Sequence, residues 1–241
     1  MAVLTLNNVS KTYLLENRQV SALTNINLTV DSGQFVTFVG RSGCGKTTLL
    51  RIIAGLEQKT CGQITFQPPE AKIGLVFQEP RLMPWLTVEN NMAFALQQEP
   101  DREYVKATVD HYLKLLRLED FRHAYPSEIS GGMAQRTALG RALCYNPDII
   151  LMDEPLGALD AFTRATLQKE LTQIFQEAHK TILFVTHDVD EAVLLGERIV
   201  VMGGGQICNE LAVPLTYPRI AASKEFYNIR SQVLAAIMEE P

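Results

Sequence analysis

The 241-residue sequence has no long apolar run. Its longest uncharged stretch, residues 19–30, has only 12 residues and includes Gln, Ser, Thr and Asn, whereas a helix that crosses a bilayer needs about 20 apolar residues. The N-terminus also lacks the basic, apolar and small-residue succession of a secretory signal. We therefore expect no membrane-spanning segment and a cytoplasmic chain.

Cysteine and histidine are both scarce, with four of each. The cysteines are separated by 17, 83 and 64 residues, which matches neither the ligand spacing of a zinc site nor a secreted disulfide scaffold. The histidines are equally scattered, with no His-x-x-x-His pair. We expect reduced thiols and no dedicated transition-metal site.

The sequence has no excess of basic residues. It has 22 Lys and Arg against 27 Asp and Glu, a net charge of −5, and no block of like charge. Non-specific binding to nucleic acid needs clustered positive charge, so we expect no nucleic acid partner. With 46% hydrophobic and 20% charged residues, the composition is that of a globular domain.

The apolar periodicity changes twice along the chain. The first forty residues predict a small antiparallel sheet that leads into a buried strand at 35–39. A period of about 3.6 then predicts helices, at 87–98, 101–118 and 131–144, with Asp101 and Ser130 as N-caps. Strands at 149–152, 181–185, 199–202 and 206–208, alternating with helices at 161–178 and 190–195, predict a mostly parallel sheet with helices on both faces.

A glycine-rich turn follows the strand at 35–39. The eight residues GRSGCGKT match the pattern G-x-x-x-x-G-K-[ST] between a predicted strand and a predicted helix, as a phosphate loop requires. Backbone N–H groups would point at an anion, Lys46 would approach the β- and γ-phosphates, and Thr47 would ligate Mg²⁺. The alternative is a turn with a chance Lys-Thr pair. The predicted nucleotide-binding residues are Gly40, Arg41, Ser42, Gly43, Cys44, Gly45, Lys46, Thr47 and Thr48.

Two carboxylates end the apolar strand at 149–152. Asp153 and Glu154 follow it, at the sheet edge where open α/β proteins bind ligands. Beside a phosphate loop, Asp153 would hold Mg²⁺, directly or through water. Glu154 would point the other way and polarise an attacking water. Without that loop, the same pattern would indicate only a solvated strand end.

A second anion site is predicted at the start of the helix at 131–144. Ser130, Gly131 and Gly132 supply a hydroxyl and backbone donors at the positive end of that helix. The alternative is an N-cap followed by glycines that pack against another helix. One nucleotide cannot easily contact both anion sites, so we expect two chains to pack head to tail, each completing the other's ATP site.

From about residue 4 to 209 the sequence resembles the ABC ATPases. The resemblance rests on the phosphate loop, Gln78 after a strand, SGGMAQR, ILMDEP, GALD and the His187 of FVTHD, in that order. It implies that Gln78 senses Mg²⁺ and the γ-phosphate, that Asp160 crosses a dimer interface, and that His187 contacts the γ-phosphate and orients water. It also implies that Tyr13 stacks on adenine. From the residues alone, the alternatives are the more common ones: an aromatic in a strand, such as Tyr13, usually packs in the core or across strands, and a strand-end histidine, such as His187, usually forms an ordinary hydrogen bond.

The resemblance completes the list of expected site residues and the fold. Lys46, Gln78, Glu154 and His187 would be catalytic, and Thr47, Gln78 and Asp153 would hold Mg²⁺. The fold would be an α/β P-loop NTPase (RecA-like), with a mostly parallel sheet, an N-terminal antiparallel β-subdomain and an inserted helical subdomain. Within a single domain at 1–241, residues 1–85 and 147–215 would form the nucleotide-binding core, 86–146 the helical subdomain and 216–241 a C-terminal helix.

One departure from the family pattern narrows the resemblance. The usual LSGGQ is ISGGM here, at 129–133, which removes a polar contact toward nucleotide. SGGM, LMPWLTVEN, LGALD and HDVDEA together resemble the importer branch for nitrate, sulfonates and taurine. This implies an ATP-hydrolysing subunit, peripheral on the cytoplasmic face of the inner membrane. Its partners would be a second ATPase subunit, identical or paralogous, transmembrane permease subunits and, indirectly, a periplasmic solute-binding protein.

Two other activities are weighed against this interpretation. A soluble ABC ATPase that clamps a macromolecule usually has coiled-coil insertions, tandem cassettes or basic patches, which this short acidic chain lacks. A phosphate-loop kinase would not explain the second anion site. Trp85, the only tryptophan, lies in an apolar patch with Pro84 and Leu86 that either receives a helix of a membrane subunit or packs inside the helical subdomain.

Overall fold

The computed structural model describes residues 2–16, 18–178 and 180–239. A six-stranded sheet forms its centre, with strand order β5-β6-β7-β3-β8-β9. The bounds are β3 Phe35–Val39, β5 Ile73–Val76, β6 Ile149–Asp153, β7 Thr181–Val185, β8 Arg198–Gly203 and β9 Gln206–Ala212. All neighbours pair in parallel except β8 with β9, which are antiparallel. The prediction of a mostly parallel sheet is confirmed.

The second sheet is antiparallel, with the order β2-β1-β4. Its strands are β1 Ala2–Leu15, β2 Arg18–Asp31 and β4 Cys61–Phe66. β1 and β2 have 14 residues each, and register shifts along their pairing let them bend. Asn8 and Asn25, with φ of 50° and 51°, provide left-handed backbone that asparagine tolerates well.

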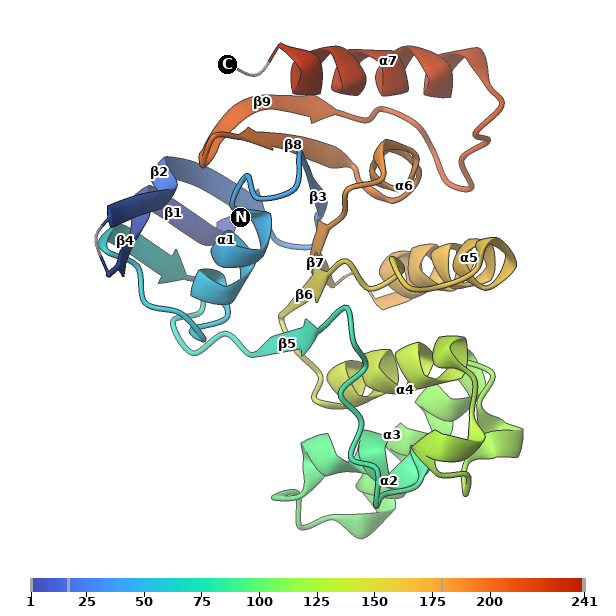
Figure 1. Cartoon of the computed structure of the whole chain (residues 1–241). Coiled ribbons are helices and arrows are strands. Elements are labelled where there is room, and N and C mark those ends of the chain that lie inside the picture. Colours follow the sequence, from blue (N-terminus) through green and yellow to red (C-terminus); the bar gives the residue numbers. More distant parts are fainter. Residues whose placement is uncertain (1, 17, 179, 240–241) are drawn as a thin grey trace.

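Helices cover both faces of the central sheet, as predicted. α1 (Lys46–Ile53) and the N-terminal sheet lie on one side, and α5 (Ala161–Ala178) lies on the other (Figure 1). The alternation along β6 explains this division, because Ile149 and Leu151 pack with α1, whereas Ile150 and Met152 pack with α5. The carboxyl ends of β6 and β7 therefore lie between two packed layers.

The segment from 88 to 144 is helical and extends below the sheet in Figure 1. It contains α2 (Val88–Ala93), η1 (Phe94–Leu96), α3 (Arg102–Leu115), η2 (Glu119–Phe121), η3 (Pro126–Glu128) and α4 (Gly131–Cys144). Asp101 and Ser130 cap α3 and α4, as predicted. The helices predicted at 87–98 and 101–118 end earlier, α2 because the chain tightens into the 3₁₀ turn η1 and α3 because Arg117 has a φ of 54°. Their apolar side chains join the α5 side of the sheet in one continuous core.

The chain ends on α6 (Val189–Leu195), β8, β9 and α7 (Lys224–Met238). α7 packs on β8 and β9 in a third apolar cluster (Figure 1). It begins eight residues later than the boundary predicted at 216, and positions 240–241 of that prediction lie outside the described residues. No helix in the described ranges is both long enough and apolar enough to cross a membrane.

Candidate functional site

The glycine-rich turn links β3 to α1, as the sequence predicts. Gly45 has a φ of 105°, and a Cβ at this position would lie 2.6 Å from the Ala22 carbonyl oxygen. At Gly40 a Cβ would lie 2.0 Å from the carbonyl oxygen of Met202. Both positions need glycine because neighbouring backbone approaches too closely for any side chain. This packing holds the glycine-rich loop directly before the N-terminus of α1.

A pocket of about 170 Å³ lies over the turn. The Lys46 side chain is only 6% exposed, and its Nζ donates to the carbonyl oxygens of Gly40, at 2.7 Å, and Arg41, at 3.1 Å. Cys44 is buried beneath it, with Sγ 3.7 Å from the same Nζ. The pocket is lined by Ala22, Ser42, Gly43, Gly45, Lys46, Thr47, Thr48 and Glu154. A buried cation and a helix N-terminus at one pocket fit the phosphates of a nucleotide.

Thr47 and Asp153 meet beside this pocket. Thr47 Oγ1 donates to Asp153 Oδ1 over 2.9 Å. Burial raises the pKa of the Asp153 carboxyl, an effect that the Thr47 hydrogen bond and the Arg51 charge oppose. A hydroxyl and a carboxylate are hard oxygen donors of the kind that Mg²⁺ takes together with substrate phosphates. These two residues therefore fit the predicted magnesium site.

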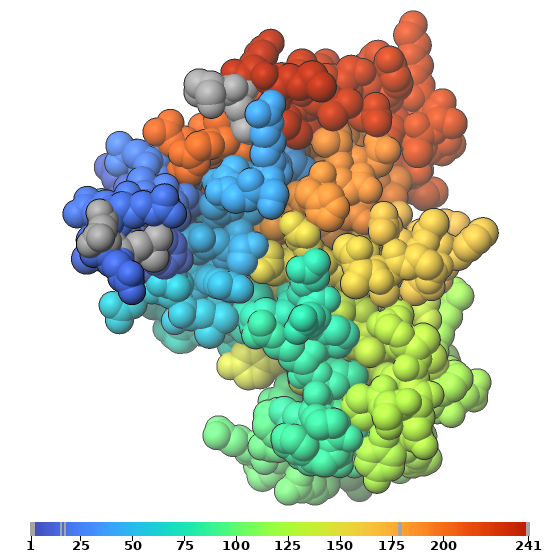
Figure 2. Space-filling model, viewed as in Figure 1, coloured from blue at the N-terminus to red at the C-terminus, as the bar shows by residue number. Residues whose placement is uncertain are grey.

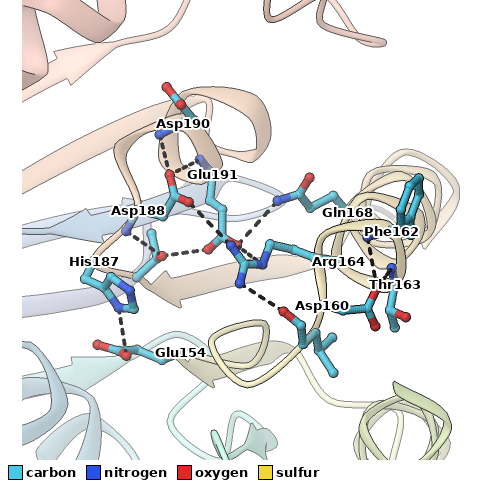
Figure 3. Close-up of polar contacts among 12 residues, drawn as sticks. Glu154, Asp160, Phe162, Thr163, Arg164, Gln168, His187, Asp188, Asp190 and Glu191 are labelled. Carbon is cyan, nitrogen blue, oxygen red and sulfur yellow. Dashed lines mark hydrogen bonds and ion pairs between the residues drawn. The ribbon is translucent and has the colours of Figure 1, made fainter. Parts of the chain in front are cut away.

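Glu154 and His187 form a pair at the ends of β6 and β7. Glu154 Oε2 lies 3.0 Å from His187 Nδ1 (Figure 3). Glu154 has a φ of 46°, and its N–H donates to the Val185 carbonyl oxygen at 2.9 Å, which holds the carboxylate past the strand end. A Cβ on Gly157 would lie 3.5 Å from Gln78 Nε2 and 3.8 Å from Glu154 Oε2. The structure thus brings Gln78, Glu154 and His187 together.

A second group of predicted residues gathers where α4 and α5 begin. The Ser130 hydroxyl caps α4 by accepting from the Met133 N–H at 3.3 Å. Asp160 caps α5 by accepting from the N–H groups of residues 162 and 163, and hydrogen bonds from Thr163, first from its side chain, lower the pKa of Asp160. A Cβ on Gly132 would lie 2.3 Å from Thr163 Cγ2. Gly132 therefore packs against the first turn of α5, the turn that Asp160 caps.

The two groups occupy different places. α1 and α4 stand apart in Figure 1, with β5 and β6 between them in that view, and the pocket over the phosphate loop is lined by neither Ser130, Gly131, Gly132 nor Asp160. Ser130, Gly131 and Asp160 are instead exposed. A single chain therefore presents the two predicted anion sites separately.

Tyr13 and Trp85 lie outside both groups. Tyr13 pairs with Val20 across β1 and β2, Lys11 Nζ sits 4.7 Å from the centre of its ring, and it does not line the pocket. Trp85 is 72% exposed, so the interpretation that it packs inside the helical subdomain is wrong. It belongs to the segment after β5, which runs along the surface shown in Figure 2.

Sequence reasoning missed two side chains that hold the Gln78 segment. Gln135 donates to the Phe77 carbonyl oxygen at 3.0 Å, and Arg141 donates to the carbonyl oxygens of Pro80 and Arg81 at 3.0 and 2.9 Å. Burial lowers the pKa of Arg141. Both residues stand on α4 among small and apolar neighbours, which was the available signal, but their partners are distant backbone groups that no spacing indicates.

Comparison with known proteins agrees with this geometry. Residues 23–157 match the model of the family described as ABC transporter. The chain is 47% identical over 236 residues to the aliphatic sulfonates import ATP-binding protein SsuB of Bacillus cereus, covering 95% of this chain and 93% of that protein. It is 43% identical over 242 residues to the SsuB protein of Bacillus subtilis, covering 98% and 94%.

A solved structure shows the same fold. It is titled a dimeric, post-hydrolysis state of the ATP-binding cassette MJ0796 bound to ADP and Pi. The two chains superpose with a TM-score of 0.79 at 34% identity, over 88% of this chain and 100% of the other.

Proposed function

This chain belongs to the ABC transporter family and is an ATP hydrolase, and on that premise we propose that it energises an importer for a small anion such as a sulfonate, nitrate or taurine. The printed names of its relatives, which concern import of aliphatic sulfonates, favour a sulfonate. The name of a relative describes that relative, so the cargo of this chain needs its own test.

One arrangement is the main support for the site: Lys46 beside the pocket, with the Glu154–His187 pair at its edge. Lys46 would bind the β- and γ-phosphates. The oxygen of a water would attack the γ-phosphorus, the bond from that phosphorus to the bridging oxygen would break, and the water proton would pass to the Glu154 carboxylate. His187, 3.0 Å from Glu154, would hold that carboxylate in place and contact the γ-phosphate.

Thr47, Asp153 and Gln78 are the residues that would hold magnesium. Thr47 and Asp153 already meet at 2.9 Å, and the Gln78 side chain reaches the same edge of the sheet beside Gly157. When bound, Mg²⁺ would neutralise charge on the phosphate oxygens. The ionised carboxylate of Asp153 supplies negative charge that attracts Mg²⁺.

We propose that two subunits, identical or paralogous, complete each other's sites. The exposed group of Ser130, Gly131 and Asp160 would contact the nucleotide on the phosphate loop of the partner. The Phe162 ring, 88% exposed directly after this group, supports an interface here, because a large apolar side chain at the surface gains from burial. The structural relative at 34% identity is titled as a dimer.

We further propose a membrane partner at the segment after β5. Trp85 is 72% exposed, stands between Pro84 and Leu86, and follows Gln78 closely in sequence. A tryptophan at the surface is a common anchor in protein interfaces. A permease helix seated there would receive the motion of the ATPase subunits, placing this chain on the cytoplasmic face of the inner membrane. A periplasmic binding protein would deliver the anion to the permease.

The first experiment tests the ATP-dependent dimer. Glu154→Gln removes the proton acceptor but leaves Lys46 in place, so the full chain should bind Mg·ATP and elute from gel filtration as a dimer. The matched control, Lys46→Ala combined with Glu154→Gln, should stay monomeric with Mg·ATP because it lacks the phosphate-binding cation. Elution of Glu154→Gln as a monomer at saturating Mg·ATP would count against the proposed interface.

The second experiment identifies the partner and the cargo. Affinity purification of the full chain from detergent-solubilised membranes should recover an integral membrane protein, in lower yield for Trp85→Ala. Recovery of a soluble macromolecular complex in its place would favour the clamping ATPase. Deletion of the gene should then abolish growth on the solute that the importer carries, whether a sulfonate, nitrate or taurine. Growth on the other two solutes should persist, because they enter by other routes.

A further inference from the structure

A buried carboxylate lies behind His187 and takes no part in the hydrolysis described above. Glu191, in the first turn of α6, is only 5% exposed. Its Oε2 accepts from Thr186 Oγ1 at 2.7 Å, and its Oε1 accepts from Gln168 Nε2 at 3.4 Å. Burial raises the pKa of Glu191, and the hydrogen bond from Thr186 opposes this increase. Burying a charge in this way is costly unless partners compensate for it, so its partners are informative.

Glu191 fixes the backbone on both sides of His187. The Thr186 hydroxyl donates to Glu191 and accepts from the Asp188 N–H at 3.0 Å (Figure 3). The Thr186 N–H is itself held by the Phe38 carbonyl oxygen at 3.1 Å. His187 therefore projects toward Glu154 from a turn whose two flanking residues share one buried hydrogen-bond network.

Arg164 connects this turn to the loop before α5. Its Nη2 donates to the Leu159 carbonyl oxygen at 3.0 Å. Its Nε lies 3.7 Å from Glu191 Oε1, and its Nη1 lies 3.9 Å from Asp188 Oδ2. Figure 3 shows the guanidinium between the start of α5 and the α6 turn. One rigid planar group thus contacts the loop that contains Asp160 and the turn that contains His187.

The contacts of Arg164 with the two carboxylates differ from those of a closed ion pair. On the same helix, Glu170 accepts a direct hydrogen bond from Arg136 at 3.0 Å, whereas Arg164 Nε is buried without a hydrogen-bond partner among the described residues. Since charge-assisted hydrogen bonds measure about 2.7–2.9 Å, a displacement of about 1 Å would close the contact with Glu191. A movement of the loop at 159–160 would displace the Arg164 guanidinium, because Arg164 donates to the Leu159 carbonyl oxygen in that loop.

We propose that Arg164 and Glu191 are positioning residues that couple the loop at 159–160 to the His187–Glu154 pair. This inference rests on the proposed function, in which Asp160 faces the second subunit. When a partner displaces that loop, the Leu159 carbonyl draws Arg164 with it, and Arg164 shifts the buried network on which His187 stands. Neither residue lines the nucleotide pocket, so both act through His187 and not on ATP.

The test uses Arg164→Gln and Glu191→Gln in the full chain, each of which removes one charge and keeps a polar side chain. The matched control is Arg117→Gln, because Arg117 also approaches a buried glutamate of α5, with its Nε 3.9 Å from Glu170. Within residues 2–16, 18–178 and 180–239, none of its ion pairs or hydrogen bonds reaches the His187 turn. Two readouts are measured: kcat and KM for ATP, and the imidazole ¹⁵N signals of His187, assigned by their absence from His187→Gln. Arg164 is about one-third exposed, so Arg164→Gln provides the test if Glu191→Gln fails to fold.

We expect each variant to lower kcat about tenfold while KM changes less than about twofold, as for a misplaced catalytic group. The His187 signals should move in both variants and stay in place in Arg117→Gln. The double variant should lose no more than the worse single one, within about twofold, because the two residues act through one contact. The inference would be overturned if the loss of kcat in the double variant equals the product of the two single losses. It would also be overturned if the His187 signals of Arg164→Gln and Glu191→Gln stay in place, as in Arg117→Gln.

Failure of the inference is distinguishable from failure of the proposed function. If the wild-type chain hydrolyses ATP and Glu154→Gln dimerises, but Arg164→Gln behaves as Arg117→Gln does, only the coupling is wrong. If the wild type shows neither activity nor ATP-dependent association, the proposed function is wrong, and the coupling within the chain is still read from the His187 signals, which need no nucleotide.

Discussion

The contact between Gly132 and Thr163 gives the sharpest prediction about how α4 and α5 are joined. In Gly132→Ala the new Cβ would lie 2.3 Å from Thr163 Cγ2, whereas carbon atoms in contact prefer about 3.5–4.0 Å. Gly132 lies in the first turn of α4 and has no left-handed backbone angle. The perturbation is therefore steric, without added backbone strain.

The expected loss of stability follows from two opposing effects. Overpacking of this kind costs about 1–3 kcal/mol, and replacing glycine by alanine in a helix returns up to about 1 kcal/mol. The net loss lies between about 0 and 3 kcal/mol, and its middle value of about 1.5 kcal/mol lowers Tm by roughly 3–6 °C for a chain of this length. Gly131→Ala is the matched control, because its Cβ would have no neighbour within 4 Å, and we expect it to leave stability unchanged or raise it.

A second substitution tests the cause directly. Thr163→Ser removes Cγ2 but keeps the hydroxyl that bonds with Asp160, and the next atoms facing a Gly132 Cβ, Thr163 Cβ and Oγ1, lie at 3.7 and 3.8 Å. Urea denaturation should therefore show Gly132→Ala with Thr163→Ser at least as stable as Thr163→Ser alone, and more stable by up to about 1 kcal/mol, the gain expected for alanine over glycine in a helix. If the double variant is no more stable than Gly132→Ala, or if Gly132→Ala equals Gly131→Ala, the contact does not limit this packing.

Three further predictions concern single side chains. Lys46→Ala should weaken Mg·ATP binding at least about tenfold, the loss expected for a charged hydrogen bond. Titration with a fluorescent nucleotide measures this affinity, and an unchanged affinity would contradict the prediction. Burial raises the pKa of Glu170 above its ordinary 4.5, although Arg136 and Arg117 oppose the increase. The carboxyl therefore binds a proton more readily in the folded chain than in the unfolded chain, and the stabilising contribution present below pH 4.5 is lost as the pH rises through the folded value. Urea denaturation should accordingly show the stability of Glu170→Gln improving relative to wild type between pH 4.5 and 7.5, and a flat or reversed difference would contradict this sign. Trp85, at 72% exposure, should be quenched readily by iodide in the isolated chain and protected in a complex with the proposed permease. Protection already present in the isolated chain would refute the exposed position.

Local signals were sufficient for most of the fold. The strand at 35–39 and the helix at 161–178 have the predicted bounds, because a run that is apolar apart from Thr37 and a long amphipathic period are each clear over their length. Asp101 and Ser130 cap the predicted helices because their side chains satisfy backbone N–H groups two or three residues away. These interactions depend on near neighbours in sequence, so the sequence alone is informative about them.

Long-range pairing was the part that spacing did not reveal. β4 pairs with β1 in the N-terminal sheet through residues that lie more than fifty positions apart in sequence, such as Leu4 with Phe66. The contact of Gly132 with Thr163 has the same character, since a glycine early in a helix is equally consistent with an anion site, a cap or close packing. The motifs predicted two anion sites, and the structure adds which other candidate residues lie near each: Glu154 lines the pocket over the phosphate loop, whereas Asp160 caps α5, against which Gly132 packs.

The two groups are nevertheless joined within one chain. Gly132 packs against Thr163, Thr163 and Arg164 are adjacent in the first turn of α5, and Arg164 reaches the Glu191 network that supports His187. A ligand that shifts the start of α4 therefore presses on the same turn from which Arg164 extends. Gly132→Ala should then disturb the His187 signals as well as stability, and Thr163→Ser should restore both together, because one turn of α5 transmits the two effects. If Thr163→Ser restores stability in Gly132→Ala but the His187 signals remain shifted, the first turn of α5 does not connect the two groups. Another contact from α4 is the hydrogen bond of Gln135 to the segment that contains Gln78.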